Sequence, residues 1–448
     1  MKINHKTLPD GMSIQGMCSY VQRETDRFGL FLDLDRICEY HWYYTMETKR
    51  AAKDICALTG LFNYSFTDNK TTYSILTRDL GVPARMLTDT HKGTPTVAKA
   101  YIENVAKAYA GTGGAVEEFL NLYTMGRNAT TIVNTYNGYL QLPQTGLLDR
   151  DGHRMLIAHP RWNILSTSRM SASNPACQNI DRDHFDIVTA PKGYQLVRAD
   201  SGQIEPRIQW SYFIKDALMR DLITAYDDAY YAYYDFISMN ENREAALRSD
   251  FAKNFTKLEI TPELKEGRQQ MKRMSLAASY GSQLSAEDGF DPVLARLYNA
   301  RIVNHPERMK LIKNIREQVY RGKDYFEGAF GTKVVPEATD KYTPGSSGWA
   351  EHLVRCGMNN PIQTTASELN CFAIYNCMNI LENKCKSSAL AYSKHDEGAV
   401  YLNEDNGDMD YAEEIADCWS YIIDGWIPIY SEMEVGRKAP HNNVTSVL

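Results

Sequence analysis

Apolar residues recur every three or four positions in the first third of the chain. The pattern is clearest from Leu34 to Thr59 and from Val97 to Tyr109, and it predicts helices in a mostly helical region that extends to about Leu140. Residues 62–69 and 89–95 separate these stretches and are rich in the residues typical of turns. The N-terminal part is therefore expected to be helical.

The pattern changes after Asp149. Residues 155–158 and 194–200 have the apolar composition of short strands, and residues from Leu390 to Leu402 predict two further strands around a tight turn. Helical periodicity dominates between them, to about Gly328. A small antiparallel sheet interrupted by a long helical insertion predicts an α+β multidomain fold.

Composition indicates an ordinary globular protein inside a cell. The chain has 448 residues, 43% of them apolar and 23% charged, which is enough for two or three domains with sizeable cores. Nine cysteines are scattered without a Cys-x-x-Cys pair, so neither a zinc cluster nor a disulfide framework is predicted. Neither a signal peptide nor a bilayer-spanning apolar run is recognisable. We expect a cytoplasmic protein without a membrane partner.

The net charge of −7 argues weakly against a nucleic-acid partner. The charges are unevenly distributed, however, because residues 251–335 hold 15 Lys or Arg against 10 Asp or Glu. This surplus makes the middle of the chain its electropositive part, and a basic cleft is compatible with an acidic protein. A solvated helical face has the same composition, so the surplus alone does not distinguish a nucleic-acid-binding cleft from an ordinary helix surface.

Two aspartates end predicted strand segments. Asp200 closes one strand, and Asp396 lies in the predicted hairpin turn. Two such carboxylates, brought together by the fold, would hold the two Mg²⁺ ions that neutralise charge in phosphoryl transfer. An Asp at a strand end is more often a simple turn former.

A ladder of residues spaced by four follows. Arg268, Lys272, Leu276 and Tyr280 fall on one face of a predicted helix, with two cations at one end and an aromatic ring at the other. The basic end suits a triphosphate, and Lys272 suits proton donation to departing pyrophosphate. Basic residues four apart are also routine on solvated helices.

Arg355, Asn359 and Gln363 form a second ladder. Their amides and guanidinium suit the hydrogen-bond acceptors of a DNA minor groove, although a plain polar surface has the same composition. Pro361 lies inside this ladder, so we expect the helix to be interrupted there and the next helix to open at Asn360-Pro361. Residues 167–180, rich in Ser and Asn, are otherwise typical of a surface loop.

The order of these motifs resembles that of the DNA polymerase I family (family A), and its bacteriophage replicative members most. The N-terminal segments 27–33 and 62–63 are similar to the family's thumb. The resemblance covers nearly the whole chain. In chain order the motifs are Arg169 with Gln178-Asn179-Ile180, Asp200-Ser201-Gly202-Gln203-Ile204-Glu205-Pro206-Arg207, the 268–281 ladder, the 355–363 ladder, and His395-Asp396-Glu397.

The resemblance implies a right-hand polymerase fold with a small palm sheet and mostly helical thumb and fingers. It places an N-terminal segment and the thumb in residues 1–148 and the first part of the palm, with the first metal-binding Asp, in residues 149–207. The fingers would be residues 208–332 and the second part of the palm residues 333–448.

The resemblance also implies the catalytic roles. Asp200 and Asp396 would bind two Mg²⁺ ions with the Ser201 carbonyl as a further ligand, and Glu397 would support the site. Lys272 would serve the chemistry as well as the triphosphate.

Substrate contacts follow from the same resemblance. Glu205 is similar to the steric gate that crowds a ribose 2′-hydroxyl and so selects deoxynucleotides. The other residues implied in nucleotide binding are Gln203, Arg268, Lys272, Leu276, Tyr280 and His395. The residues implied in binding primer–template DNA are Arg169, Gln178, Asn179, Arg355, Asn359 and Gln363.

The chain departs from the family pattern in several places. Ser201-Gly202 replaces an aromatic residue and Ser, and Asp228-Ala229-Tyr230 replaces an Asp-x-His that helps hold phosphate, which puts phosphate contacts there in doubt. Pro206 replaces an aliphatic residue but suits the first turn of a helix. Leu276 stands where Phe or Tyr is usual and has no hydroxyl, so discrimination against dideoxynucleotides is expected.

Proofreading relatives carry an exonuclease domain ahead of the thumb. Here the thumb-like pattern begins at Arg27, so we expect no intrinsic 3′-to-5′ exonuclease, and Asp33-Leu34-Asp35 only mimics an acidic pair. A separate exonuclease or processivity subunit would then be a partner.

Two other functions compete with this interpretation. A single-subunit RNA polymerase shares the two-aspartate palm, but Glu205 and His395-Asp396-Glu397 argue against it. A catalytically silent DNA-binding replisome subunit is expected to have lost an acid or a triphosphate cation, and all of them are present.

Overall fold

The computed structural model forms two compact units, residues 31–158 and residues 1–30 with 159–448. Residues 1–30 thus group with the larger unit, although the sequence places them in one segment with the thumb. The residues that the structure describes are 2–3, 13–89, 93–149, 151–180, 182–254, 262–279, 283–285, 290–339, 342–346 and 348–436.

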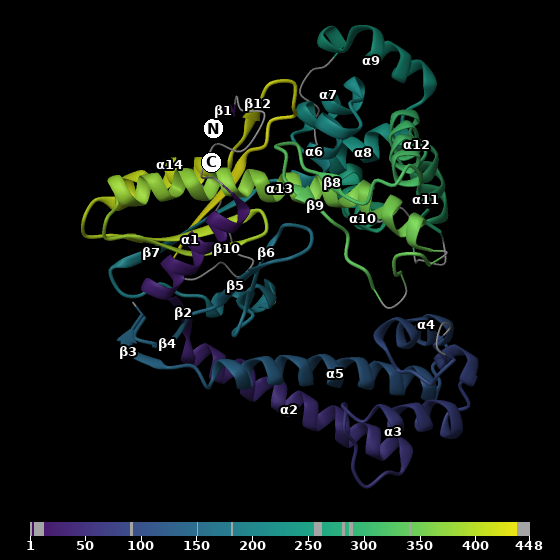
Figure 1. The fold of residues 1–448 in the computed structure, drawn as a ribbon. Helices are drawn as coiled ribbons and strands as arrows, with labels where there is room; N and C mark the ends of the chain where they lie inside the picture. Colours follow the sequence, from purple (N-terminus) through teal and green to yellow (C-terminus); the bar gives the residue numbers. More distant parts are fainter. Residues whose placement is uncertain are drawn as a thin grey trace. The chain divides into compact units, whose positions relative to one another are not determined.

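The smaller unit is built on two long helices that run side by side (Figure 1). Asp33 caps the first of them by accepting a hydrogen bond from the Arg36 amide, and Gly60 ends it with φ +73°. The smaller unit contains α2 (Leu34–Thr59), α3 (Asn69–Ser74), α4 (Lys99–Tyr109), α5 (Ala115–Tyr139), and the three-stranded sheet β2 (Leu30–Asp33), β4 (Arg154–Ala158), β3 (Gln144–Leu148).

The predicted helices of this unit are confirmed. The first has the predicted bounds, and the second begins at Lys99 instead of Val97. At the packing interface, a Cβ added at Gly126 of α5 would lie 2.0 Å from the buried Phe66 ring, so only glycine fits there.

The larger unit holds a four-stranded antiparallel sheet in the order β10-β11-β7-β13. Its strands are β7 (Tyr194–Ser201), β10 (Ala389–Lys394), β11 (Glu397–Asn403) and β13 (Ser431–Gly436). The chain segment between β7 and β10 includes the long helical insertion, as predicted from the sequence. The predicted hairpin is confirmed, with His395 and Asp396 as its turn.

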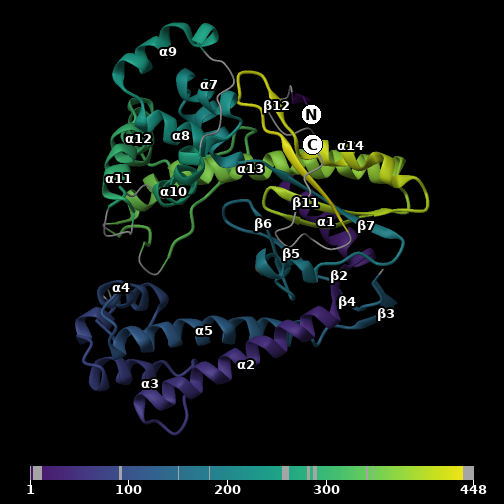
Figure 2. The same cartoon turned by 180° about the vertical axis from the view of Figure 1, so that it is seen from behind.

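Helices pack on this sheet and form most of the insertion (Figure 2). They are α1 (Ile14–Arg27), α6 (Ile204–Ile208), α7 (Ala217–Tyr226), α8 (Ala229–Ser238), α9 (Glu241–Asn254), α10 (Pro262–Ser279), α11 (Pro292–Tyr298), α12 (Pro306–Tyr320), α13 (Trp349–Asn383) and α14 (Ala412–Ala416). The short strands are β1 (Lys2–Ile3) with β12 (Ile422–Ile423), β5 (Arg161–Ile164) with β6 (Met170–Ser173), and β8 (Phe326–Glu327) with β9 (Lys333–Val334).

The interruption predicted at Pro361 is wrong, because α13 is one helix of 35 residues with Pro361 inside it. A proline in a helix interior removes one hydrogen bond and costs roughly 3 kcal/mol. Every residue from Asn360 to Ile374 is buried, so α13 is surrounded by packing partners along that stretch. This burial outweighs the local cost, and periodicity around one face could not reveal it.

Candidate active site

The sheet brings the two predicted metal-binding aspartates together. Asp200 lies near the end of β7 directly opposite Glu397 of β11, and Asp396 is the turn residue just before Glu397. The Ser201 amide donates a 3.0 Å hydrogen bond to the Asp396 carbonyl, which fixes the strand end to the turn. Both aspartates therefore lie at the same end of two neighbouring strands.

The pKa of both carboxyls is raised by their surroundings. Asp200 keeps a solvent-accessible surface, but the protein atoms around it displace much of the water, and with the negative charges of Asp396, Glu397 and Glu432 they raise its pKa to about 8. Desolvation likewise raises the pKa of Asp396 to about 6, against the lowering effect of Arg169. Crowded carboxylates of this kind favour a cation, and oxygen ligands suit Mg²⁺.

Glu397 is engaged inside the protein. Its carboxylate accepts hydrogen bonds from Arg198 Nε at 2.9 Å and from the Tyr392 hydroxyl. Arg198 also binds Glu434 at 2.5 Å, and its guanidinium lies 4.9 Å from the Phe185 ring centroid. Glu397 thus shares a partly buried cation with Glu434.

Ser201 is buried, and its hydroxyl donates to the Trp419 carbonyl. This bond orients the backbone after Asp200, and the role of the Ser201 carbonyl as a metal ligand stays a prediction. Glu432 of β13 stands opposite Asp200 on the other side of β7 and is exposed. Neither Glu432 nor Arg198 was predicted from the sequence, although Arg198 shares a face with Asp200 by the two-residue period of a strand.

The first predicted ladder lies on α10, and Asp228 holds its first cation. Arg268 Nε donates to Asp228 Oδ2 at 2.7 Å, and the guanidinium lies 5.5 Å from each of the Tyr230 and Tyr231 ring centroids. The same Asp228 oxygen accepts from Gln203 Nε2, also at 2.7 Å. The segment whose phosphate contacts were in doubt therefore positions Arg268.

Three separate motifs meet in one narrow cavity of about 20 Å³. Glu205 of α6, Leu276 of α10 and Asn359 of α13 line it together with Tyr230. Leu276 is 52% exposed, and Lys272, one turn before it, is partly buried. Tyr280 lies outside the described residues. The fold thus brings the predicted sugar gate close to the predicted base-pair platform.

Arg169 forms an ion pair with Glu205. It also acts at the turn between β10 and β11, where desolvation and the positive charges of Arg169 and Lys394 lower the pKa of His395. From the sequence, Arg169 was predicted to bind primer–template DNA and Glu205 to contact the nucleotide, so their pairing was not expected.

The other predicted DNA contacts lie in different environments. The Gln178 amide bonds the backbone of Met170, Ala172 and Ser393, so it ties β6 to β10. Arg355 lies 5.0 Å from the Tyr342 ring centroid. Asn179 is exposed, Asn359 is partly buried, and Gln363 is buried in α13. Their roles toward DNA stay predictions.

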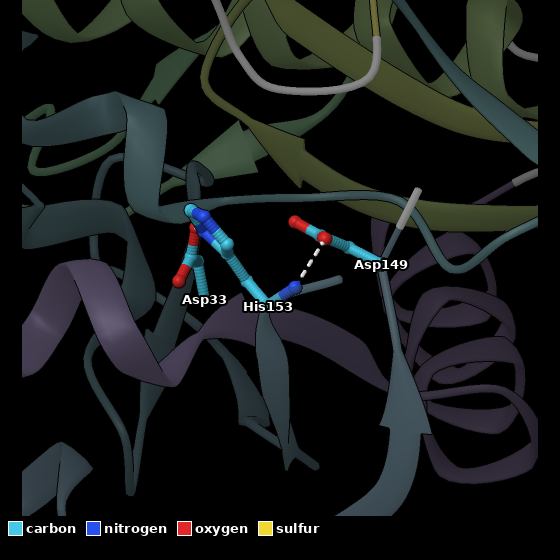
Figure 3. Close-up of side chains that lie close together, drawn as sticks. All are labelled: Asp33, Asp149 and His153. Atoms are coloured by element: carbon cyan, nitrogen blue, oxygen red, sulfur yellow. Dashed lines mark hydrogen bonds and ion pairs between the residues drawn. The ribbon is translucent and has the colours of Figure 1, made fainter. Parts of the chain in front are cut away.

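The smaller unit has its own acidic cluster. Asp33, Asp149 and His153 place one ligand atom each within 4.8 Å of the others (Figure 3). Asp33 accepts from His153 Nδ1 at 2.8 Å, and Asp149 accepts from the His153 amide at 2.8 Å. Asp35 pairs with Arg154. Through these bonds, Asp33 and Asp35 connect the start of α2 to the β3–β4 hairpin.

A larger cavity of about 920 Å³ lies between α3, α4 and α5 of the smaller unit. It contains none of the predicted site residues, so cavity size alone would not have found the aspartates. Among the described residues, no helix has the length and apolar character needed to cross a membrane.

An antiparallel sheet with one acid at a strand end, another in the adjoining hairpin turn, and a helical insertion between them defines a polymerase-type palm. The chain belongs to DNA polymerase family A, whose sequence profile matches residues 36–438.

The chain is similar to DNA polymerase I of Pseudomonas aeruginosa, with 24% identity over 346 residues. That match covers 74% of this chain but only 33% of the relative, so the chain spans about a third of the relative's length. The fold is similar to the POL domain of Pol1 from M. smegmatis, solved in complex with DNA primer-template and dNTP. This second match has a TM-score of 0.73 at 21% identity and covers 95% of this chain and 70% of that one.

Proposed function

We propose that the protein is a template-directed DNA polymerase that adds deoxynucleotides to a primer 3′ end. The observation that carries this proposal is the meeting of Asp200 and Asp396, through the Ser201–Asp396 backbone bond, in a family A fold. Its substrates would be primer–template DNA and dNTPs, and its setting the cytoplasm. A bacteriophage-type replicative role rests on motif resemblance alone.

Asp200 and Asp396 would hold two Mg²⁺ ions. Their crowded carboxylates and raised pKa values fit a divalent oxygen-binding cation. Such ions, when bound, neutralise charge on the attacking and leaving oxygens. Arg198 holds Glu397 in an ion pair, so the two aspartates are more available than Glu397 as metal ligands.

Residues of the insertion would bind the nucleotide. Arg268 is fixed by Asp228 and offers its remaining N–H groups to a triphosphate. Lys272, one turn along α10, would give a proton to the departing pyrophosphate. Glu205 would crowd a ribose 2′-hydroxyl, and Leu276 would border the new base pair.

Primer extension tests the proposal. The purified chain is incubated with primer–template DNA and Mg²⁺, with deoxynucleotides or ribonucleotides, beside Asp396→Asn and Asp417→Asn, an acid at the C-cap of α14. Extension with deoxynucleotides that Asp396→Asn abolishes and Asp417→Asn keeps is expected. A preference for ribonucleotides, or no extension despite tight DNA binding, would replace the proposal with an RNA polymerase or a silent DNA-binding subunit.

A further inference from the structure

The Arg169–Glu205 ion pair joins two residues with different expected ligands. Their side chains are 24% and 28% exposed, so the pair is partly shielded from water. While the pair exists, Arg169 donates to Glu205, and a guanidinium so engaged has fewer N–H groups for a minor groove.

The position of Arg169 is fixed by its surroundings. The Leu165 amide donates to the Arg169 carbonyl, and the Ser168 amide donates to the Leu165 carbonyl, both at 2.8 Å, so Arg169 closes a tight turn. Gln178 then ties β6, which starts at the next residue, to Ser393 of β10 at 3.0 Å. The arginine is thereby anchored to the catalytic hairpin.

Glu205 and Arg169 bring opposite charges close to Asp396. Glu205 acts on Asp396 as a like charge, whereas Arg169 acts on Asp396 as an opposite charge. Without Arg169, repulsion from Asp396 would push the Glu205 carboxylate away from the catalytic turn. Glu205 also lines the cavity beside Leu276, so such a shift would change the wall next to a bound sugar.

We infer that Arg169 is a positioning residue for sugar selection, because its ion pair holds the Glu205 carboxylate where it excludes a ribose 2′-hydroxyl. The inference rests on the proposed function. An apolar wall discriminates against a substrate with an added hydroxyl only about a hundredfold. The selectivity for deoxynucleotides therefore depends on the exact position of the Glu205 carboxylate. A charge-assisted hydrogen bond supplies the required fixation.

The test is the ratio of kcat/KM for a deoxynucleotide to that for the matching ribonucleotide. In Arg169→Ala this ratio falls by about tenfold or more, which corresponds to about 1.4 kcal/mol of selectivity, mainly because ribonucleotide incorporation improves. Glu205→Ala lowers the ratio similarly, and the double variant is no less selective than the worse single variant. If Arg169 contacts only DNA, both nucleotides slow equally, the ratio stays constant and the inference is overturned.

Glu205→Gln gives a second test that leaves Arg169 intact. The glutamine keeps the size of the Glu205 side chain but loses the ion pair. The kcat/KM ratio is therefore expected to fall if the ion pair positions the gate, and to stay constant if side-chain size alone excludes the ribonucleotide. Arg169→Lys retains a cation and recovers part of the ratio. Arg161 is an exposed arginine of the β5–β6 hairpin, in which Arg169 directly precedes β6, and Arg161→Ala leaves the ratio unchanged. Wild-type protein that extends no primer would refute the proposed function, whereas an unchanged ratio in active variants would refute only this inference.

Discussion

Replacing Arg198 by Met tests how much the charge of this arginine stabilises the palm, where it pairs with Glu397 and Glu434. Methionine has a similar length but no charge, so the change removes the cation and keeps much of the packing. Arg198 is 16% exposed, and its partners Glu397 and Glu434 are 13% and 28% exposed. After the replacement, two partly buried carboxylates face each other across β7 without a counter-charge.

The cost follows from this burial. Removing one partner of a buried ion pair costs roughly 3–5 kcal/mol, and the exposure of Glu434 places the expected loss at the lower end, about 3 kcal/mol.

Urea unfolding at pH 7, followed by tryptophan fluorescence, measures this loss of stability. Because the chain has two units, the transition that includes the fully buried Trp419 is the one to compare. Glu434→Gln serves as a control and costs less, since Arg198 keeps Glu397. Arg198→Met with wild-type stability at pH 7 would refute the reasoning.

Three further outcomes are expected. Gly398→Ala destabilises the β10–β11 hairpin by about 3 kcal/mol and lowers primer extension, because the added Cβ would lie 1.9 Å from the buried Trp419 ring. Asp200→Asn melts at a higher temperature than the wild type without metal at pH 9, since the pKa raised from 3.8 to about 8 makes ionisation costly in the folded state. Leu276→Tyr increases incorporation of dideoxynucleotides relative to deoxynucleotides, because it restores the missing hydroxyl.

Each outcome has its own control. Trp419→Phe, combined with Gly398→Ala, recovers part of the stability, and an unaltered melting temperature of Gly398→Ala would contradict the packing. For Asp200, stability of the wild type falls as the pH rises from about 4 to about 8, so the gap to the Asn variant opens over that window. Mg²⁺ then stabilises the wild type but not the variant. Leu276→Met is the control for nucleotide choice, and equal use of both nucleotides by the wild type would contradict the prediction.

Much of the fold was predictable from local patterns. The period of 3.6 residues gave Leu34–Thr59 as a helix, and alternating strand composition around a tight turn gave the hairpin at His395–Asp396. These signals are local because capping, periodicity and turn formation involve neighbours in the chain. The continuous α13 was not predictable, because the packing that tolerates Pro361 comes from residues distant in sequence.

The sequence by itself determined the residue types of the site and their order, and through them the family. Only the tertiary structure decided which charges neighbour each other. In the folded chain Arg198 forms an ion pair with Glu397, Arg268 with Asp228, and Arg169 with Glu205. These pairings arise from strand register and from helices that the chain brings together over long separations. The strength of each pair depends on burial, which no local pattern encodes.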